Sequence, residues 1–175
     1  MLVRLGLYTG LRPAEMAWLK WDSVNLKSGI VTVQRTKCPS TGVEWVPKNK
    51  KKREVDMKFA AVSVVDNYQR RRINDFVIGK RSQYHKNMMS NSPVRTDRPQ
   101  RIFKNLIKTL VENVSDTFRD VTLYSLRHTY CTSMLRSKVD LETVRDRMGH
   151  RHISTTQQYL HAIDAEAHPS DALPY

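Results

Sequence analysis

Apolar residues recur at helical spacing through most of this 175-residue chain, and this periodicity limits the folds that it can adopt. The clearest stripe runs from Ile102 to Val111, and another begins near Ser125. Strand-like sequence is confined to short runs at residues 30–33, 43–46 and 53–57. A chain of this length has room for one domain with a sizeable core, or little more. The pattern predicts an α+β fold, mostly helical with one small antiparallel sheet.

Residues typical of helix ends bound several of the helical segments. Pro13 suits the first helical position after the turn at residues 9–12. Asp140 is a good cap for a short helix that Gly149 ends. The remaining helices are expected at residues 2–8, from 60 onward, and from 154 to about 163. Residues 79–100 show little periodicity, which indicates a long loop, and long loops are often functional.

Positive charge is the strongest feature of the composition. The chain has 30 Lys and Arg residues against 17 Asp and Glu, a formal net charge of +13. One basic run covers residues 48–53, and eleven further basic residues lie between 67 and 108. Duplex DNA is the natural partner, because each neutralised phosphate releases condensed counterions. The plainer alternative is a set of solvated helix faces with a basic loop.

Several other classes of protein are excluded by what the chain lacks. No stretch approaches the roughly 20 apolar residues of a membrane-spanning helix. The opening residues are too short for a signal peptide and lack a small-residue cleavage site. Cys38 and Cys131 lie far apart in sequence, so neither a disulfide framework nor a paired-cysteine metal site is expected. We therefore expect a soluble protein of a reducing, cytoplasmic compartment, without a membrane partner.

Three segments place polar residues where a helical core does not need them. They are Thr9–Glu15, Tyr124–His128, and Met148–His150 with Ser154–His161. Each has an ordinary explanation by itself: a helix-start arginine is usually a surface ion pair, and a helical tyrosine usually packs. Their order and spacing are more specific, since Arg127 follows Arg12 by 115 positions and precedes Tyr159 by 32.

Taken together, these segments resemble the catalytic domain of the tyrosine recombinases, in particular integrases of phages and mobile elements. The family carries a Thr-Gly-Leu-Arg-Pro-x-Glu motif and a His/Lys/Tyr-x-Leu-Arg-His motif. Its third motif is Leu/Met-Gly-His, followed nine residues later by the tyrosine of Ser-Thr-Thr-x-x-Tyr-x-His. The likeness covers about residues 2–163, and three joint motifs are far stronger than one short motif.

The resemblance implies a role for each matching residue. Arg12 and Arg127 clamp the scissile phosphate, a role suited to guanidinium groups that donate bidentately to phosphate oxygens. Tyr159 is the nucleophile, which attacks phosphorus and forms a 3′-phosphotyrosyl link. His150 binds the phosphate or positions the tyrosine, and Glu15 holds Arg12. Neither ATP nor a metal ion is implied as a cofactor.

In the family, a lysine between two strands donates a proton to the leaving oxygen. Lys48 fits that segment best, although Lys50 and Lys51 are close alternatives and Lys37 is a more distant one. We also expect Lys50, Lys51, Lys52 and Arg53 to contact DNA.

One position departs from the commonest family pattern. Tyr124 stands three residues before Arg127, where His or Lys is usual. Its phenol can donate a hydrogen bond to phosphate, but with a reference pKa of about 10 it is a poor base. His128 is expected to be structural, on the inner side of its helix. The group that accepts the Tyr159 proton therefore stays open.

The resemblance also implies a domain organisation and partners. Residues 1–163 correspond to a catalytic domain truncated at its N-terminus, without the family's core-binding domain, and 164–175 form a C-terminal tail. On DNA, a homotetramer with tails packed in trans is implied, serving integration or excision of a bacterial or phage-encoded element. Two alternatives stay open: a type IB topoisomerase, which relaxes DNA without strand exchange, and a DNA-binding module that forms no covalent link.

Overall fold

The computed structural model describes residues 1–57, 59–69, 75–78 and 92–167. Helices there are α1 (Leu2–Thr9), α2 (Pro13–Trp18), η1 (Trp21–Ser23), α3 (Phe59–Gln69), α4 (Arg98–Asn113), η2 (Asp116–Phe118), α5 (Leu123–Arg136), α6 (Leu141–Met148) and α7 (Ser154–Ala167). Strands are β1 (Val24–Asn25), β2 (Ile30–Val33), β3 (Thr36–Lys37), β4 (Glu44–Trp45) and β5 (Arg53–Asp56). The mostly helical α+β prediction is confirmed.

Five short strands form two antiparallel sheets among the described residues. The first has the order β1-β2-β5, with Val31 opposite Val55, and the second pairs β3 with β4. The prediction of one sheet that includes residues 43–46 was therefore wrong. These residues pair with the nearer β3 instead, because a tight turn closes the chain at Gly42, whose N–H donates to Cys38 O at 2.9 Å.

Most predicted helix ends are confirmed. Arg12 precedes α2, which begins at Pro13, and Asp140 caps α6 by accepting from the N–H of Thr143 at 2.8 Å. Gly149 ends α6 in the left-handed conformation, at φ 63°.

Two predicted boundaries change. The predicted loop ends earlier than residue 100, because α4 starts at Arg98. The last helix, α7, continues to Ala167, beyond its predicted end at about 163. The rest of that loop at 79–91, Arg70 to Arg72, and residues 168–175 of the predicted tail lie outside the described residues.

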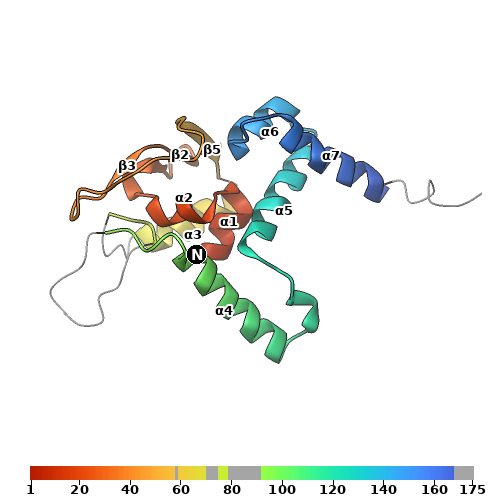
Figure 1. Cartoon of the computed structure of the whole chain (residues 1–175), viewed down its shortest axis with the longest axis horizontal. Coiled ribbons are helices and arrows are strands. Elements are labelled where there is room, and N and C mark those ends of the chain that lie inside the picture. The colour runs from red at the N-terminus through yellow and green to blue at the C-terminus, as the bar shows by residue number, and fades with distance from the viewer. Residues whose placement is uncertain (58, 70–74, 79–91, 168–175) are drawn as a thin grey trace, which may run out of the picture.

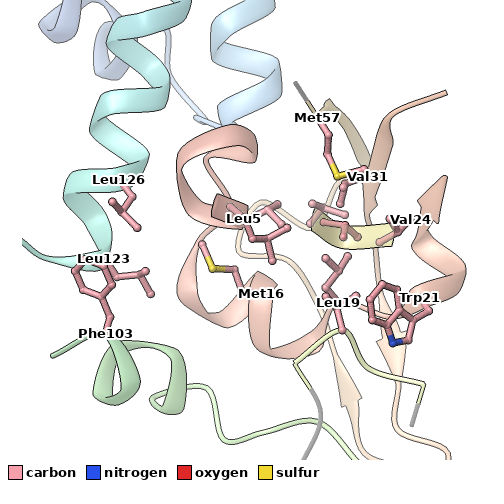
Figure 2. Close-up of a cluster of buried hydrophobic side chains, with 14 of the residues drawn as sticks. Leu5, Met16, Leu19, Trp21, Val24, Val31, Met57, Phe103, Leu123 and Leu126 are labelled. Carbon is pink, nitrogen blue, oxygen red and sulfur yellow. The ribbon is translucent and has the colours of Figure 1, made fainter. Parts of the chain in front are cut away.

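The main core lies between α1, α2, the first sheet and α5. Figure 2 shows Leu5 and Met16 between Val31 of the sheet and Leu126 of α5, with Phe103 of α4 below. A second cluster joins α5, α6 and β5 through buried residues that include Val55, Tyr130 and Met148. Both clusters include residues of α5. They therefore bring the end of α1, the end of α6 and the start of β5 together at the side of α5.

The arrangement of helices brings distant segments together. In Figure 1, α5 runs beside α1, and its C-terminal half carries α6 and α7 on the side away from α4. The turn after α1, the start of β5 and the end of α6 therefore converge near the middle of α5. Within the described residues, no helix combines the length and apolar character needed to cross a membrane.

Gly10 ends α1 in a tight position against α5. Its φ is +59°, and a Cβ there would lie 2.5 Å from Cδ1 of Tyr130. Gly42 has a similar φ of +70°, but a Cβ there would meet only the end of the Lys37 side chain at 4.0 Å. The two glycines thus share a backbone conformation and differ in the room that each leaves for a Cβ atom.

We expect Gly10→Ala to lower the free energy of unfolding by about 2–5 kcal/mol, because backbone strain and overpacking add. Gly42→Ala, the matched control, should cost only the strain, about 1–2 kcal/mol. Urea unfolding followed by circular dichroism measures both values. Equal losses for the two variants would contradict the close contact with Tyr130.

Candidate active site

Arg12 and Arg127, predicted from separate motifs, converge in one place. Arg127 is buried on α5, and its guanidinium donates to the carbonyl oxygens of Gly10 and Met148. Arg12, just before α2, donates from Nη2 to Gly149 O at 2.9 Å. Burial, followed by the charge of Arg12, lowers the pKa of Arg127 to about 10, so its side chain is still a cation at neutral pH.

Glu15 is the buried carboxylate that binds Arg12. It is 3% exposed, and its Oε1 accepts from Arg12 Nη1 at 3.1 Å while Oε2 accepts from the Arg12 N–H at 2.8 Å. Burial alone would raise the pKa of the Glu15 carboxyl, but hydrogen bonds and the charges of Arg53 and Arg12 outweigh it and hold the pKa below its ordinary value. Glu15 thus contacts Arg12 directly, and its role as the support for Arg12 stays a prediction.

Arg53 is buried, unlike the exposed lysines before it, although it lines the same cleft. Its expected contact with DNA stays a prediction. Arg53 is 9% exposed, and its Nη1 and Nη2 donate to the two oxygens of Glu15 at 2.9 and 2.7 Å. Its Nε donates to Arg147 O at 2.9 Å. The physical reason is strand alternation: Arg53 shares the inner face of β5 with Val55, whereas Glu54 and Asp56 face outward.

Tyr159 lies on α7, half-buried between two histidines. Its ring centroid is 4.9 Å from that of His128 and 6.2 Å from that of His150, with the His150 ring nearly parallel. His128 is exposed on α5, so the expectation that it lies on the inner side of its helix was wrong. The ring contact gives His128 a place beside Tyr159 instead.

His150 is fixed by a residue that the sequence analysis did not single out. Its Nδ1 lies 2.9 Å from Oγ1 of Thr156, which is fully buried. The available signal was helical spacing, because Thr156 precedes Tyr159 by three positions and shares its face of α7. Because Nδ1 makes this contact, Nε2 is the ring nitrogen of His150 that remains for a contact with another group.

Burial and neighbouring charges shift the pKa values of His150 and Tyr159. Burial, Arg127 and Arg12 lower the pKa of His150 to about 4, so the imidazole is neutral at pH 7. Burial raises the pKa of Tyr159 above its ordinary value, while Arg127 and Arg12 act in the opposite direction. The phenol is therefore protonated at neutral pH, next to cations that favour its phenolate.

The lysine run lines an open cleft of about 1090 Å³ between the β4–β5 loop and α6. Lys48, Lys50, Lys51 and Lys52 all line it, and His150 lies on the opposite wall with Arg145, Arg147 and Arg151. Lys37 is on β3, within the other hairpin, and is absent from this lining. The arginines of α6 were not predicted, because on a short helix they resemble solvated surface charges.

The lysines sit on a defined turn. The N–H of Lys50 donates to Pro47 O at 2.8 Å, and Lys50 has a positive φ of 58°. All four lysine side chains are exposed.

Tyr124 occupies the first turn of α5, one turn before Arg127, and is 46% exposed. Its predicted role toward phosphate stays a prediction. Among the described residues, no group of three or more His, Cys, Asp or Glu side chains is placed to hold a metal ion.

Comparison with known proteins supports the grouping of these segments. The model of the phage integrase family matches residues 1–166. The tyrosine recombinase XerA of Pyrococcus furiosus is 31% identical over 163 residues, which cover 90% of this chain and 48% of that protein. The tyrosine recombinase XerD of Listeria innocua is 26% identical over 153 residues, 87% of this chain and 46% of the relative. The chain thus spans about half the length of the curated relatives it matches.

Solved structures share the fold. A crystal structure of XerA recombinase superimposes with a TM-score of 0.67 at 25% identity, covering 98% of this chain and 57% of that one. The Tn1549 transposon integrase in complex with transposon right end DNA gives a TM-score of 0.74 at 19% identity, over 97% of this chain and 58% of the other.

We expect Glu15→Gln to destabilise the fold by about 3–5 kcal/mol, because it leaves buried guanidinium charge without its carboxylate. The exposed pair of Arg35 and Glu44, 3.3 Å apart, supplies the control. Glu44→Gln should change the free energy of unfolding by at most about 1 kcal/mol. Chemical denaturation measures both, and a small effect of Glu15→Gln would contradict the buried network.

The pKa of His150 predicts a pH dependence of stability. The folded value of about 4 lies below the unfolded value of about 6.5, so between these pH values the unfolded chain binds the proton more tightly. The contribution of His150 is complete above pH 6.5 and is lost as the pH falls toward 4. The melting temperature should therefore fall less between pH 7 and pH 5 in His150→Gln than in the wild type. His152→Gln, at an exposed position, should keep the wild-type drop, and equal drops in all three would refute the assignment.

Proposed function

This chain belongs to the phage integrase family of tyrosine recombinases, and we propose that it cuts and rejoins DNA strands through a covalent link between Tyr159 and a 3′ phosphate. One observation carries the proposal: Arg12, Arg127, His150 and Tyr159 come from three distant motifs and surround one place. Two convergent guanidinium groups beside a phenol are suited to a phosphodiester, and they act without ATP.

The chemistry is a transfer between two phosphodiesters. The oxygen of Tyr159 attacks phosphorus, the phenol proton is lost to solvent, and the bond from phosphorus to the 5′ oxygen breaks. A lysine of the run, with Lys48 as the first candidate, gives its proton to the leaving oxygen as a 5′ hydroxyl forms. The reverse attack by another 5′ hydroxyl rejoins the strands, so the energy of the bond is retained.

Each remaining side chain has a part that its environment favours. Arg12 and Arg127 stabilise the charge that develops on the phosphate oxygens in the transition state. Their pre-set hydrogen bonds to carbonyl oxygens mean that little reorganisation is needed when DNA binds. Neutral His150 offers Nε2 to the phosphate, since Nδ1 is engaged with Thr156.

The partner that we propose is duplex DNA. The cleft lining combines the exposed lysines with Arg145, Arg147 and Arg151, against the acidic Glu54 and Asp146. A solved structure of the same fold, the Tn1549 transposon integrase, holds transposon right end DNA. By this analogy we propose integration or excision of a mobile element. From the family resemblance of the motifs we propose a tetramer in which C-terminal tails pack on neighbouring subunits.

We expect a covalent adduct between the wild-type protein and nicked duplex DNA. The substrate is a pool of labelled duplexes with randomised arms, in which a nick lets the short strand beyond the cut diffuse away. The adduct resists SDS, and mass spectrometry should map the phosphotyrosyl peptide to Tyr159. Tyr159→Phe should abolish the band and leave duplex affinity within about twofold, because the ring is kept.

Two other outcomes would contradict this function. Salt-sensitive binding of the pool without any adduct would indicate a DNA-binding module. Relaxation of a supercoiled plasmid through the Tyr159 adduct, without strand exchange between two trapped sites, would indicate a topoisomerase.

A further inference from the structure

Arg53 joins the lysine run to the rest of the site, and its buried side chain is held by three hydrogen bonds. All of its nitrogens are engaged: Nη1 and Nη2 with Glu15, and Nε with Arg147 O, at distances of 2.7–2.9 Å. We propose that Arg53 is a positioning residue that fixes the lysine run against the arginine pair. The proposal rests on the strand transfer proposed above and assigns a role that the motifs do not.

Arg53 contacts two other segments of the site, α2 and the end of α6. Glu15, its bidentate partner, also accepts from Arg12. At the end of α6, a Cβ on Gly149 would lie 3.0 Å from Cζ of Arg53, so the guanidinium packs directly on the glycine before His150. One side chain therefore sets the distance between the turn before α2, the end of α6 and the first residue of β5.

The lysine run needs such an attachment. On its N-terminal side, β4 is only two residues long and pairs with β3, outside the three-stranded sheet. The lysines themselves are exposed, and the turn at Pro47–Lys50 is local. On the C-terminal side, Arg53 begins β5 and follows Lys52 directly. Fixing Arg53 fixes the end of the loop from which a lysine reaches the leaving oxygen.

A direct contact between Arg53 and a DNA phosphate would have a different signature. Its buried side chain has exchanged solvent for Glu15 and a carbonyl oxygen, so it releases no counterion when DNA binds. A positioning role changes the rate of the cleavage step and leaves affinity and salt dependence unchanged. An arginine is needed for it, because an ammonium group cannot donate to both oxygens of a carboxylate and to a carbonyl in a plane.

The test compares two leaving groups in single-turnover adduct formation. One nicked duplex, taken from the trapped pool, carries the normal 5′ oxygen at the scissile phosphate, and the other carries a bridging sulfur. A thiol has a pKa of about 8.5 against 15.7 for water, so the thiolate leaves without a donated proton. Sulfur therefore rescues variants that lose or misplace the proton donor, whichever lysine it is.

We expect Arg53→Lys and Arg53→Met to form the adduct about 100-fold more slowly on the oxygen substrate, within the range of a lost general acid. The sulfur substrate should bring both variants to within about tenfold of the wild type, as it should for Lys48→Ala if Lys48 is the donor. Arg127→Ala should stay slow on both substrates. Affinity for a 30-base-pair duplex and its salt slope should equal those of the wild type in both Arg53 variants.

Arg35→Lys is the matched control. Arg35, like Arg53, forms an ion pair with a glutamate, in this case Glu44 of β4, but Arg35 does not line the cleft. Arg35→Lys should behave as the wild type throughout. Circular dichroism confirms folding, and Arg53→Lys decides the test if Arg53→Met is unfolded.

Three results would overturn this proposal and leave the strand transfer in place. Slow reaction of Arg53→Lys on both substrates would mean that Arg53 acts on the arginine pair instead of the lysine run. A weaker salt slope, by about one counterion, would mean a phosphate contact. Wild-type rates in Arg53→Lys would remove any role. A wild type that forms no adduct at all refutes the strand transfer itself, and this inference falls with it.

Discussion

The buried carboxylate of Glu15 is the interaction on which the rest of the site depends. Arg12 and Arg53 both bind it, and Arg127 lies close enough for its pKa to respond to Arg12, Glu15 and Arg53. Guanidinium groups that lie so close together repel one another, and burial strengthens the repulsion. The carbonyl oxygens of Gly10, Met148 and Gly149 offset part of it by accepting from Arg127 and Arg12. The turn after α1, the start of β5 and the end of α6 are therefore held together by polar contacts, with the apolar clusters on either side.

The same excess of positive charge prepares the site for an anion. One carboxylate faces three guanidinium groups, so the network has net positive charge before any ligand binds. This field, together with burial, keeps His150 neutral and favours the phenolate of Tyr159 against the effect of burial. In the proposed strand transfer, the phosphodiester supplies the missing negative charge, and the fixed donors need little rearrangement to receive it. Stability and chemistry thus use the same arginines.

The basic residues of the chain divide into two classes that composition alone does not distinguish. The lysines at 48 and 50–52 are exposed on the wall of an open cleft, where flexible ammonium groups suit phosphate contacts and proton donation. Arg53, the next residue along the chain, is buried with its donors engaged. Strand alternation separates the two classes, since only the inner face of β5 meets Glu15. The boundary between exposed charge in the cleft and buried structural charge therefore falls between two adjacent residues.

The sequence by itself determined the helices, several of their ends and the three motif segments. These features depend on local periodicity, capping chemistry and residue type, as Pro13, Asp140 and Gly149 show. Only the tertiary structure decided that Arg53 is buried, that His128 is exposed beside Tyr159, and that residues 44–45 join a separate hairpin. The contacts that fix the site join residues 94, 117 and 137 positions apart. A local pattern reports which face of an element is apolar, but it does not report which distant carboxylate or carbonyl meets a polar side chain on that face.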